Sequence, residues 1–114
     1  MEVKIEFFKG VSEQTVPIIR LTKSKSKTTG TATFIFINPH VFSFIKQNAL
    51  TLEEMSLLWS KNKISTQDIS ILFNKGKPFL IKSIFIFKNS KDWFEFLNFM
   101  KYYSEEFGLG FTKP

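Results

Sequence analysis

The sequence predicts an α+β fold: a single domain with a mainly antiparallel β-sheet, a long C-terminal helix packed on one face of the sheet, and a short helical connection. Short segments alternate apolar and polar residues, as half-buried strands do. The polar connections between them are of hairpin length, which favours antiparallel pairing. One long segment near the C-terminus has apolar residues at helical spacing. The 114 residues suit one domain, residues 1–114.

The first third of the chain predicts three strands. Val3 to Phe8 and Ile18 to Lys23 alternate apolar and polar residues. A polar loop, residues 24–30, then leads into Thr31 to Ile37, which is rich in β-branched and aromatic side chains. The second and third strands are expected to form a hairpin with a basic tip. Because Thr31 to Ile37 is apolar on both faces, we expect a central strand that is covered on each side.

The middle of the chain predicts a connection and three more strands. His40 to Asn48 indicates a short helix or an irregular connection. Glu54 to Trp59 is expected to be a strand, and Ile64 to Phe73 a single further strand. After the turn at residues 74–78, in which Gly76 can adopt a positive φ, Phe79 to Phe87 is the final strand.

The C-terminal segment predicts the clearest element, a helix. Asn89 or Ser90 can cap its start, and Asp92 in the first turn complements the helix dipole. Gly108 is suited to end it. The residues that recur at helical spacing are Trp93, Leu97, Met100, Ser104 and Phe107, reinforced by Phe96 and Tyr103. We expect this stripe to face the sheet.

The residues offer no catalytic or metal-binding constellation. The absence of cysteine excludes disulfides, thiolate zinc sites and cysteine nucleophiles. His40 is the only histidine, and no serine lies in a Gly-x-Ser-x-Gly elbow. The adjacent pairs Glu53-Glu54 and Glu105-Glu106 point to different faces, so neither is an acid/base couple. We therefore expect a binding domain without catalytic residues, metal or cofactor.

The net charge of +6 favours an acidic partner, either nucleic acid or an anionic membrane face. Arg20 is the only arginine, whereas Lys, Phe, Ile, Asn and Ser are abundant. This usage is typical of A/T-rich coding DNA, as in organelle genomes, and nucleic-acid readers favour arginine. The alternative, a small basic nucleic-acid-binding module, requires exposed aromatic residues on one sheet face. We expect most of Phe34, Phe36, Phe85 and Phe87 to be buried.

One charge cluster deserves a hypothesis, because Arg20, Lys23, Lys25 and Lys27 lie close together in the predicted hairpin. Such runs are most often solvated hairpin tips. The functional interpretation is a patch that faces anions on a membrane surface or an acidic protein loop.

Three stretches carry a resemblance to a known family. The first is VPIIRLTKS (16–24) with GTATFIF (30–36), and the second is the turn FNKGKP (73–78). The third is the ending, with KDW (91–93), the pair FM (99–100), Tyr103 and EEFGLGF (105–111). Together they resemble, from end to end, the Psb28 family of photosystem II proteins of cyanobacteria and plastids. One departure is the turn at residues 60–63, which is basic where relatives tend to be acidic.

The resemblance implies a non-enzymatic assembly factor. Family members are soluble, peripheral proteins on the stromal or cytosolic side of the thylakoid, held there through protein. They bind photosystem II assembly intermediates transiently, near the inner chlorophyll-binding antenna protein and the reaction-centre subunits. The antenna protein's C-terminal segment is understood to add strands to the family's sheet. No nucleic acid is expected as a partner, and the composition suggests a plastid-encoded protein of the chloroplast.

The residues predicted to contact the partner lie on the hairpin. They are Arg20, Lys23, Thr31 and Thr33. The sequence does not say which strand forms the sheet edge, so this prediction depends on where the hairpin lies in the sheet.

Overall fold

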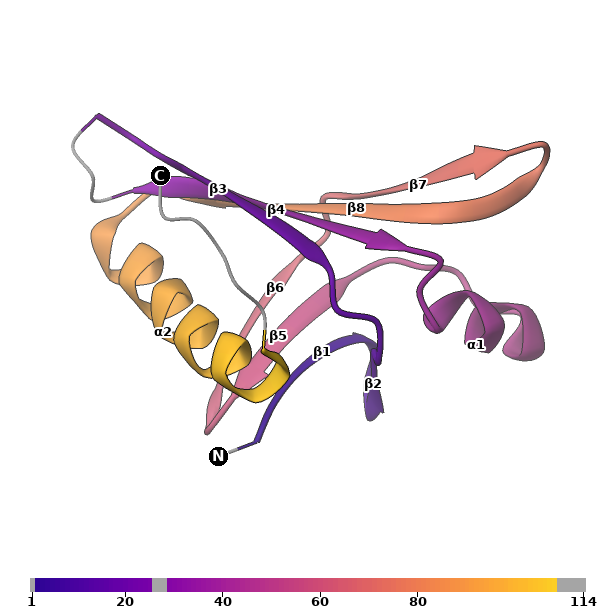
Figure 1. The fold of residues 1–114 in the computed structure, drawn as a ribbon, viewed down its shortest axis with the longest axis horizontal. Helices are drawn as coiled ribbons and strands as arrows, with labels where there is room; N and C mark the ends of the chain where they lie inside the picture. The colour runs from indigo at the N-terminus through magenta and orange to yellow at the C-terminus, as the bar shows by residue number, and fades with distance from the viewer. Residues whose placement is uncertain (1, 26–28, 109–114) are drawn as a thin grey trace.

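The computed structural model describes residues 2–25 and 29–108, and it contains strands and helices in the order shown in Figure 1. The strands are β1 (Val3–Phe8), β2 (Val11–Ser12), β3 (Ile18–Lys23), β4 (Gly30–Ile37), β5 (Met55–Trp59), β6 (Asn62–Thr66), β7 (Ile69–Asn74) and β8 (Lys77–Phe87). The helices are α1 (Val41–Asn48) and α2 (Ser90–Phe107). The predicted α+β class, the short helical connection and the long C-terminal helix are confirmed.

The strands form two antiparallel sheets. Sheet A has the order β2-β1-β5-β6, and sheet B has the order β3-β4-β8-β7. In Figure 1, sheet B extends across the top of the molecule, and sheet A and both helices lie beneath it. Antiparallel pairing was predicted from the short connections, whereas the division into two sheets was not.

The predicted single strand from Ile64 to Phe73 is wrong. The chain leaves sheet A at the end of β6 and enters sheet B at the start of β7, across Gln67 and Asp68. The hydroxyl of Thr66 accepts a hydrogen bond from Asp68 N (3.1 Å) and donates one to Ile84 O (2.7 Å). These two bonds hold the corner at which the chain passes from sheet A to sheet B. The alternation of apolar and polar residues did not predict this corner.

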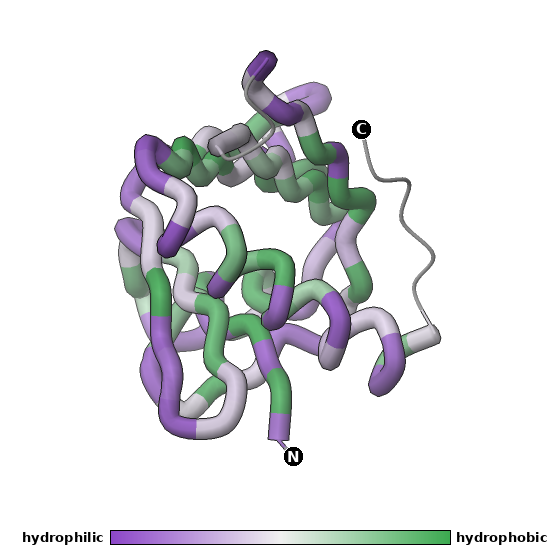
Figure 2. Tube along the Cα trace, turned by 90° about the vertical axis from the view of Figure 1, so that its left-hand side faces the viewer, coloured by the Kyte–Doolittle hydropathy of each residue, from purple (hydrophilic) through white to green (hydrophobic). Residues whose placement is uncertain are grey.

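The core lies where the two sheets and α2 meet. Its members are the buried residues Val3, Ile5, Phe7, Met55, Leu57 and Trp59 of sheet A, Ala32, Phe34, Phe36, Ile81, Phe85 and Phe87 of sheet B, and Trp93, Phe96, Phe99, Met100 and Tyr103 of α2. In Figure 2, hydrophobic positions concentrate in the strands, and hydrophilic ones are frequent in the turns. The apolar faces predicted from alternation in β1 and β5 therefore point inward, whereas Ile18 of β3 and Phe73 of β7 are exposed.

Aromatic contacts join the three parts of the core. The ring pairs that connect them are Phe7–Phe36 between the sheets (5.1 Å between centroids), Phe34–Phe96 between sheet B and α2 (6.2 Å), and Trp59–Phe99 between sheet A and α2 (5.5 Å). All three have the edge-to-face geometry that aromatic pairs favour.

Helix α2 begins and ends where the sequence predicts. The Asn89 side chain accepts a hydrogen bond from Asp92 N and donates one to the Asp92 carboxylate, each at 2.9 Å. Gly108 ends the helix with φ +67°, in the left-handed region. Of the predicted stripe, Trp93, Phe96, Met100 and Tyr103 are buried, Leu97 and Ser104 are half-buried, and Phe107 is 39% exposed at the last turn.

Strand β4 is central, as predicted, but it is covered on one face only. It pairs with β3 on one side and β8 on the other. Ala32, Phe34 and Phe36 are buried, whereas Ile37, on the opposite face, is 52% exposed. The expectation of cover on both faces is wrong, because sheet A and both helices lie on the same side of sheet B (Figure 1).

A buried carboxylate fixes the start of α1. Glu13, in the connection between β2 and β3, is 6% exposed. Its Oε2 accepts hydrogen bonds from Thr15 N and His40 N (2.9 Å each), and its Oε1 accepts one from Val41 N (2.8 Å). His40, at the helix N-cap, makes no capping bond with its own side chain. Glu13 therefore caps α1 from a distant part of the chain.

Replacing Glu13 by Gln tests this cap. The amide nitrogen would present a donor to backbone N–H groups, so at least one charge-assisted bond is lost. We expect the free energy of unfolding to fall by about 2 kcal/mol, measured by urea denaturation. The exposed Glu105→Gln is the matched control, and equal stability of the two variants would contradict the role of Glu13.

Replacing Gly30 by Ala tests the packing of α2 on sheet B. A Cβ there would lie 2.8 Å from Cη2 of Trp93 and 2.5 Å from Thr22 O. We expect Gly30→Ala to destabilise the fold by about 1–3 kcal/mol through overpacking, seen as a lower melting temperature.

The smaller ring of Trp93→Phe would relieve one of these two clashes. The cost of Gly30→Ala is then expected to be smaller in the Trp93→Phe background than in the wild type. Strict additivity of the two substitutions would show that Gly30 and Trp93 are not coupled.

Candidate functional site

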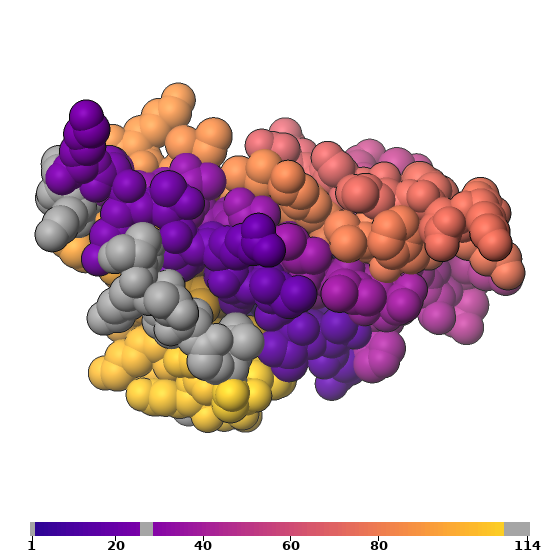
Figure 3. Space-filling model, turned by 45° about the horizontal axis from the view of Figure 1, so that its top comes forward, coloured from indigo at the N-terminus to yellow at the C-terminus, as the bar shows by residue number. Residues whose placement is uncertain are grey.

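The outer face of sheet B is not covered by either helix or by sheet A. We define the outer face as Ile18, Arg20, Thr22, Thr31, Thr33, Ile35, Ile37, Leu72, Leu80, Lys82, Ile84 and Ile86, which the strand registers place on one side. In Figure 3 this face is turned toward the viewer, and its strands lie side by side. Ile18 and Ile86 are 49% and 63% exposed. An apolar surface of this kind is typical of an interaction site.

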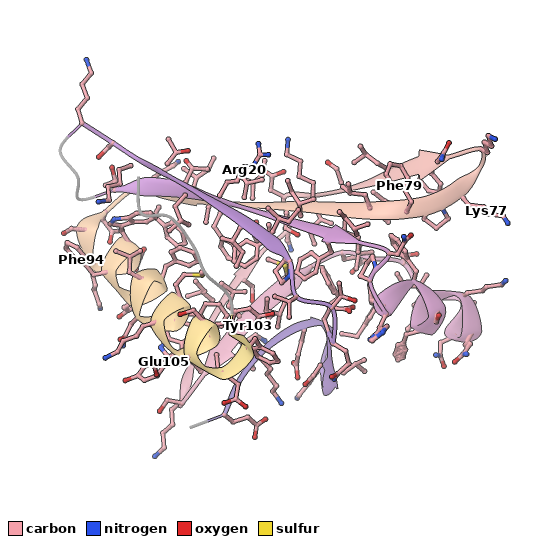
Figure 4. The ribbon with its side chains drawn as sticks, in the orientation of Figure 1. Arg20, Lys77, Phe79, Phe94, Tyr103 and Glu105 are labelled. Atoms are coloured by element: carbon pink, nitrogen blue, oxygen red, sulfur yellow. The ribbon has the colours of Figure 1, made fainter. Side chains whose placement is uncertain are left out.

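Three of the four predicted contact residues meet on the outer face. Arg20 lies opposite Thr33, and Thr22 lies opposite Thr31. Figure 4 shows Arg20 above sheet B, on the side away from α2. Lys23 pairs with Gly30, and its side chain alternates to the other face. The structure therefore groups Arg20, Thr31 and Thr33 and separates the Lys23 side chain from them.

The predicted basic cluster is also divided. Arg20 is exposed within β3, and Lys25 is exposed in the turn that follows β3. Lys27 lies outside the described residues.

Strand β3 forms one edge of sheet B. Among the described strands, only β4 pairs with it. Just after β3, Ser24 N donates a hydrogen bond to Thr29 O (3.0 Å). In an antiparallel ladder, residues that bond with the neighbouring strand alternate with residues whose backbone groups face the other way. Thr22 and Arg20 therefore bond with β4, whereas the backbone groups of Leu21 and Lys23 point away from the sheet. A partner strand can pair with this edge.

The other edges are β7 in sheet B and β2 and β6 in sheet A. β2 has two residues, which is too short to template a partner strand. Both edges of sheet B border the outer face, and β3 differs from β7 because it carries Arg20 there.

Sequence reasoning missed the isoleucine side chains of the outer face. The stretch that ends at Ile37 is apolar on both sides, and that pattern was interpreted as burial, whereas nothing was predicted for Ile86. Solvent exposure of one apolar face could be inferred only by counting how many elements remain to cover it.

The titratable side chains of the described residues matter here as possible metal ligands and for their pKa values. Within residues 2–25 and 29–108, no three His, Cys, Asp or Glu side chains lie close enough to hold a metal ion. Burial first, and the charge of Glu13 next, raise the pKa of Tyr103 far above its usual range. Tyr103 points from α2 into the interior (Figure 4) and stays neutral as part of the core.

The four phenylalanines that a nucleic-acid platform would require do not face solvent. Phe34, Phe36, Phe85 and Phe87 are all buried, as predicted. The outer face presents isoleucine and threonine instead, and base stacking requires exposed rings. Separately, in the part of the chain that the structure describes, no helix is both long and apolar enough to cross a membrane.

Comparison with known proteins gives a consistent result. The family model described as Psb28 protein matches residues 5–111. A photosystem II reaction center Psb28 protein from Trieres chinensis is 43% identical, over 99% of this chain and 98% of its own length. Proteins of the same description from Phaeodactylum tricornutum and Prochlorococcus marinus are 41% and 37% identical, over 98% and 92% of their own lengths. With matches over nearly its whole length, the chain belongs to the Psb28 protein family.

Proposed function

We propose that this protein is a non-enzymatic assembly factor that binds photosystem II assembly intermediates by adding a partner strand to the β3 edge of sheet B. The family membership and the shared description of the relatives as photosystem II reaction center proteins support the photosystem as partner. The observation that carries the mechanism is a six-residue strand that pairs on one side only and lies beside an uncovered face.

The backbone of β3 supplies the affinity in this mechanism. The N–H and C=O groups of Leu21 and Lys23 point away from the sheet, so an extended partner segment can continue the ladder. Such pairing needs no particular side-chain chemistry. A catalytic constellation is therefore not required.

The outer face supplies specificity. Arg20 lies on the edge strand itself and can form a bidentate pair with a partner carboxylate. Thr31 and Thr33, on the neighbouring strand, offer hydroxyl groups to the same partner. Ile18 adds an apolar contact that is 49% exposed in the free protein.

The proposed place of action is the stromal side of the plastid thylakoid, where the protein is peripheral and held through protein. The proposed neighbours are the inner chlorophyll-binding antenna protein and the reaction-centre subunits. Relatives from the algae Trieres chinensis and Pyropia yezoensis and from the cyanobacterium Prochlorococcus marinus, all described as photosystem II proteins, support a thylakoid setting.

A pull-down from detergent-solubilised thylakoids tests the proposal. With this chain as bait, mass spectrometry is expected to recover the reaction-centre subunits and the inner antenna protein, without the subunits of the mature oxygen-evolving complex. Capture of unrelated proteins or nucleic acid, with no photosystem subunits, would contradict the proposed assembly role.

The β3 edge is tested by two substitutions at one position. Lys23→Pro removes an N–H that points away from the sheet, whereas Lys23→Ala removes the side chain and keeps that donor. Loss of one hydrogen bond predicts capture that is weaker by roughly fivefold for Lys23→Pro, with little change for Lys23→Ala. Equal capture by both, with melting temperatures like the wild type, would exclude pairing at this edge.

A further inference from the structure

The hairpin of β7 and β8 projects beyond the rest of sheet B. Strand β4 ends at Ile37, opposite Leu80, and Asn38 N donates a last hydrogen bond to Phe79 O (2.7 Å). From there to the turn at Lys75 and Gly76, β7 and β8 pair only with each other. In Figure 1 this end of the hairpin extends above α1 at one end of the molecule. The space between the hairpin and α1 therefore has no strand to fill it.

This space is a groove of about 570 Å³. Its lining residues are Phe42, Ser43, Ile45 and Lys46 of α1, Ile71 and Phe73 of β7, and Lys77 and Pro78 of β8. The walls are mainly apolar, and Phe73 is 61% exposed. A volume of this size is typical of sites for small amphiphilic ligands.

The charged residues that line the groove are all positive. Lys46 lies on the α1 side and Lys77 on the hairpin side, and none of the eight lining residues is acidic. Lys75 adds a third cation in the adjoining turn. An anion at the rim would have lysines on both sides and no carboxylate opposing it.

A second groove of the protein has a lining of mixed charge, so an excess of lysine is not common to both grooves. The groove along the exposed side of α2 is larger, about 730 Å³. There Lys91 and Lys101 are balanced by Glu95 and Glu105, so that groove has no preference for an anion. Phe94 lies in its lining and is 54% exposed. The two grooves therefore differ in charge and not in the presence of an exposed aromatic ring.

The polar groups of the lining decide between a polypeptide and a hydrocarbon chain as occupant. Ser43 is the only uncharged polar side chain among the lining residues. A peptide backbone carries an N–H and a C=O at each residue. The free backbone groups of the β7 edge lie in the plane of sheet B and not toward α1, so most of the peptide's groups would find no partner between these walls. A hydrocarbon chain has no such groups, and its burial is favourable there.

We propose that the groove between α1 and the β7–β8 hairpin binds an anionic lipid of a bilayer leaflet. The hydrocarbon chain lies against Phe42, Ile71 and Phe73, and the headgroup lies between Lys46 and Lys77. The site is at the opposite end of sheet B from the β3–β4 turn (Figure 1). It adds a lipid contact to an attachment that is made through protein, and it does not depend on the β3 edge.

Co-sedimentation with vesicles tests this site. The full chain is mixed with vesicles of phosphatidylcholine alone or of phosphatidylcholine with phosphatidylglycerol. Binding is expected only to the vesicles that contain phosphatidylglycerol. The double variant Lys46→Ser/Lys77→Ser is expected to bind roughly 25-fold more weakly, about fivefold for each lysine.

The matched control is Lys91→Ser/Lys101→Ser, which removes the same charge from the α2 groove. It is expected to bind like the wild type. An equal loss in both double variants would mean that only the net positive charge attracts the vesicles, and would overturn the site. So would an absence of binding to phosphatidylglycerol vesicles.

The apolar wall is tested by a second pair, Phe73→Ser and Phe94→Ser. Both rings are largely exposed, so both variants are expected to keep the wild-type melting temperature. Only Phe73→Ser is expected to weaken vesicle binding. If Phe73→Ser binds vesicles as the wild type does, or if the protein binds monomeric dodecanoate but no vesicles, the bilayer lipid is excluded as the occupant. Photosystem capture by the same variants is measured in parallel, so failure of the lipid site is distinguishable from failure of the assembly role.

Discussion

The packing of α2 against both sheets is the interaction on which the rest of the structure depends. Trp93 sits against Gly30, which has no side chain to displace the indole, and Phe96 and Phe99 reach one sheet each. The indole nitrogen of Trp93 has no hydrogen-bond partner within the described residues. Shape complementarity and apolar burial therefore hold this helix, so a small change in shape at Gly30 lowers the stability of the fold.

This packing also determines which surface remains free. Because α2 and sheet A share one side of sheet B, the opposite side has nothing left in the described residues to cover it. The same choice leaves β3 as an edge with backbone groups unpaired. An uncovered apolar face and a free strand edge thus both arise from the placement of the core.

The buried Glu13 carboxylate has a comparable role at the other end of the molecule. It ties the start of α1 to the connection before β3 through three backbone N–H groups. Helix α1 forms one wall of the groove beside the β7–β8 hairpin, so Glu13 holds the start of the helix that makes this wall. A charged side chain that the sequence places in an unremarkable loop therefore shapes a surface far from it in the chain.

The sequence alone determined the local elements. Alternation located β1, β3 and β5, and the Asn89 cap with Gly108 bounded α2, because these signals depend on neighbouring residues only. Of the candidate site, the sequence identified Arg20, Thr31 and Thr33 as hairpin residues. Their common face depends on the hairpin register, which the structure supplies and which separates the Lys23 side chain from them.

Tertiary structure decided what these elements do together. It divided the predicted strand from Ile64 to Phe73 between two sheets, left Ile37 and Ile86 facing outward, and made β3 an edge. An apolar side chain has the same local pattern whether another layer covers it or not. Whether another layer covers an apolar face depends on where distant elements pack. The packing of these elements is determined by the apolar burial of the whole chain and not by any one segment.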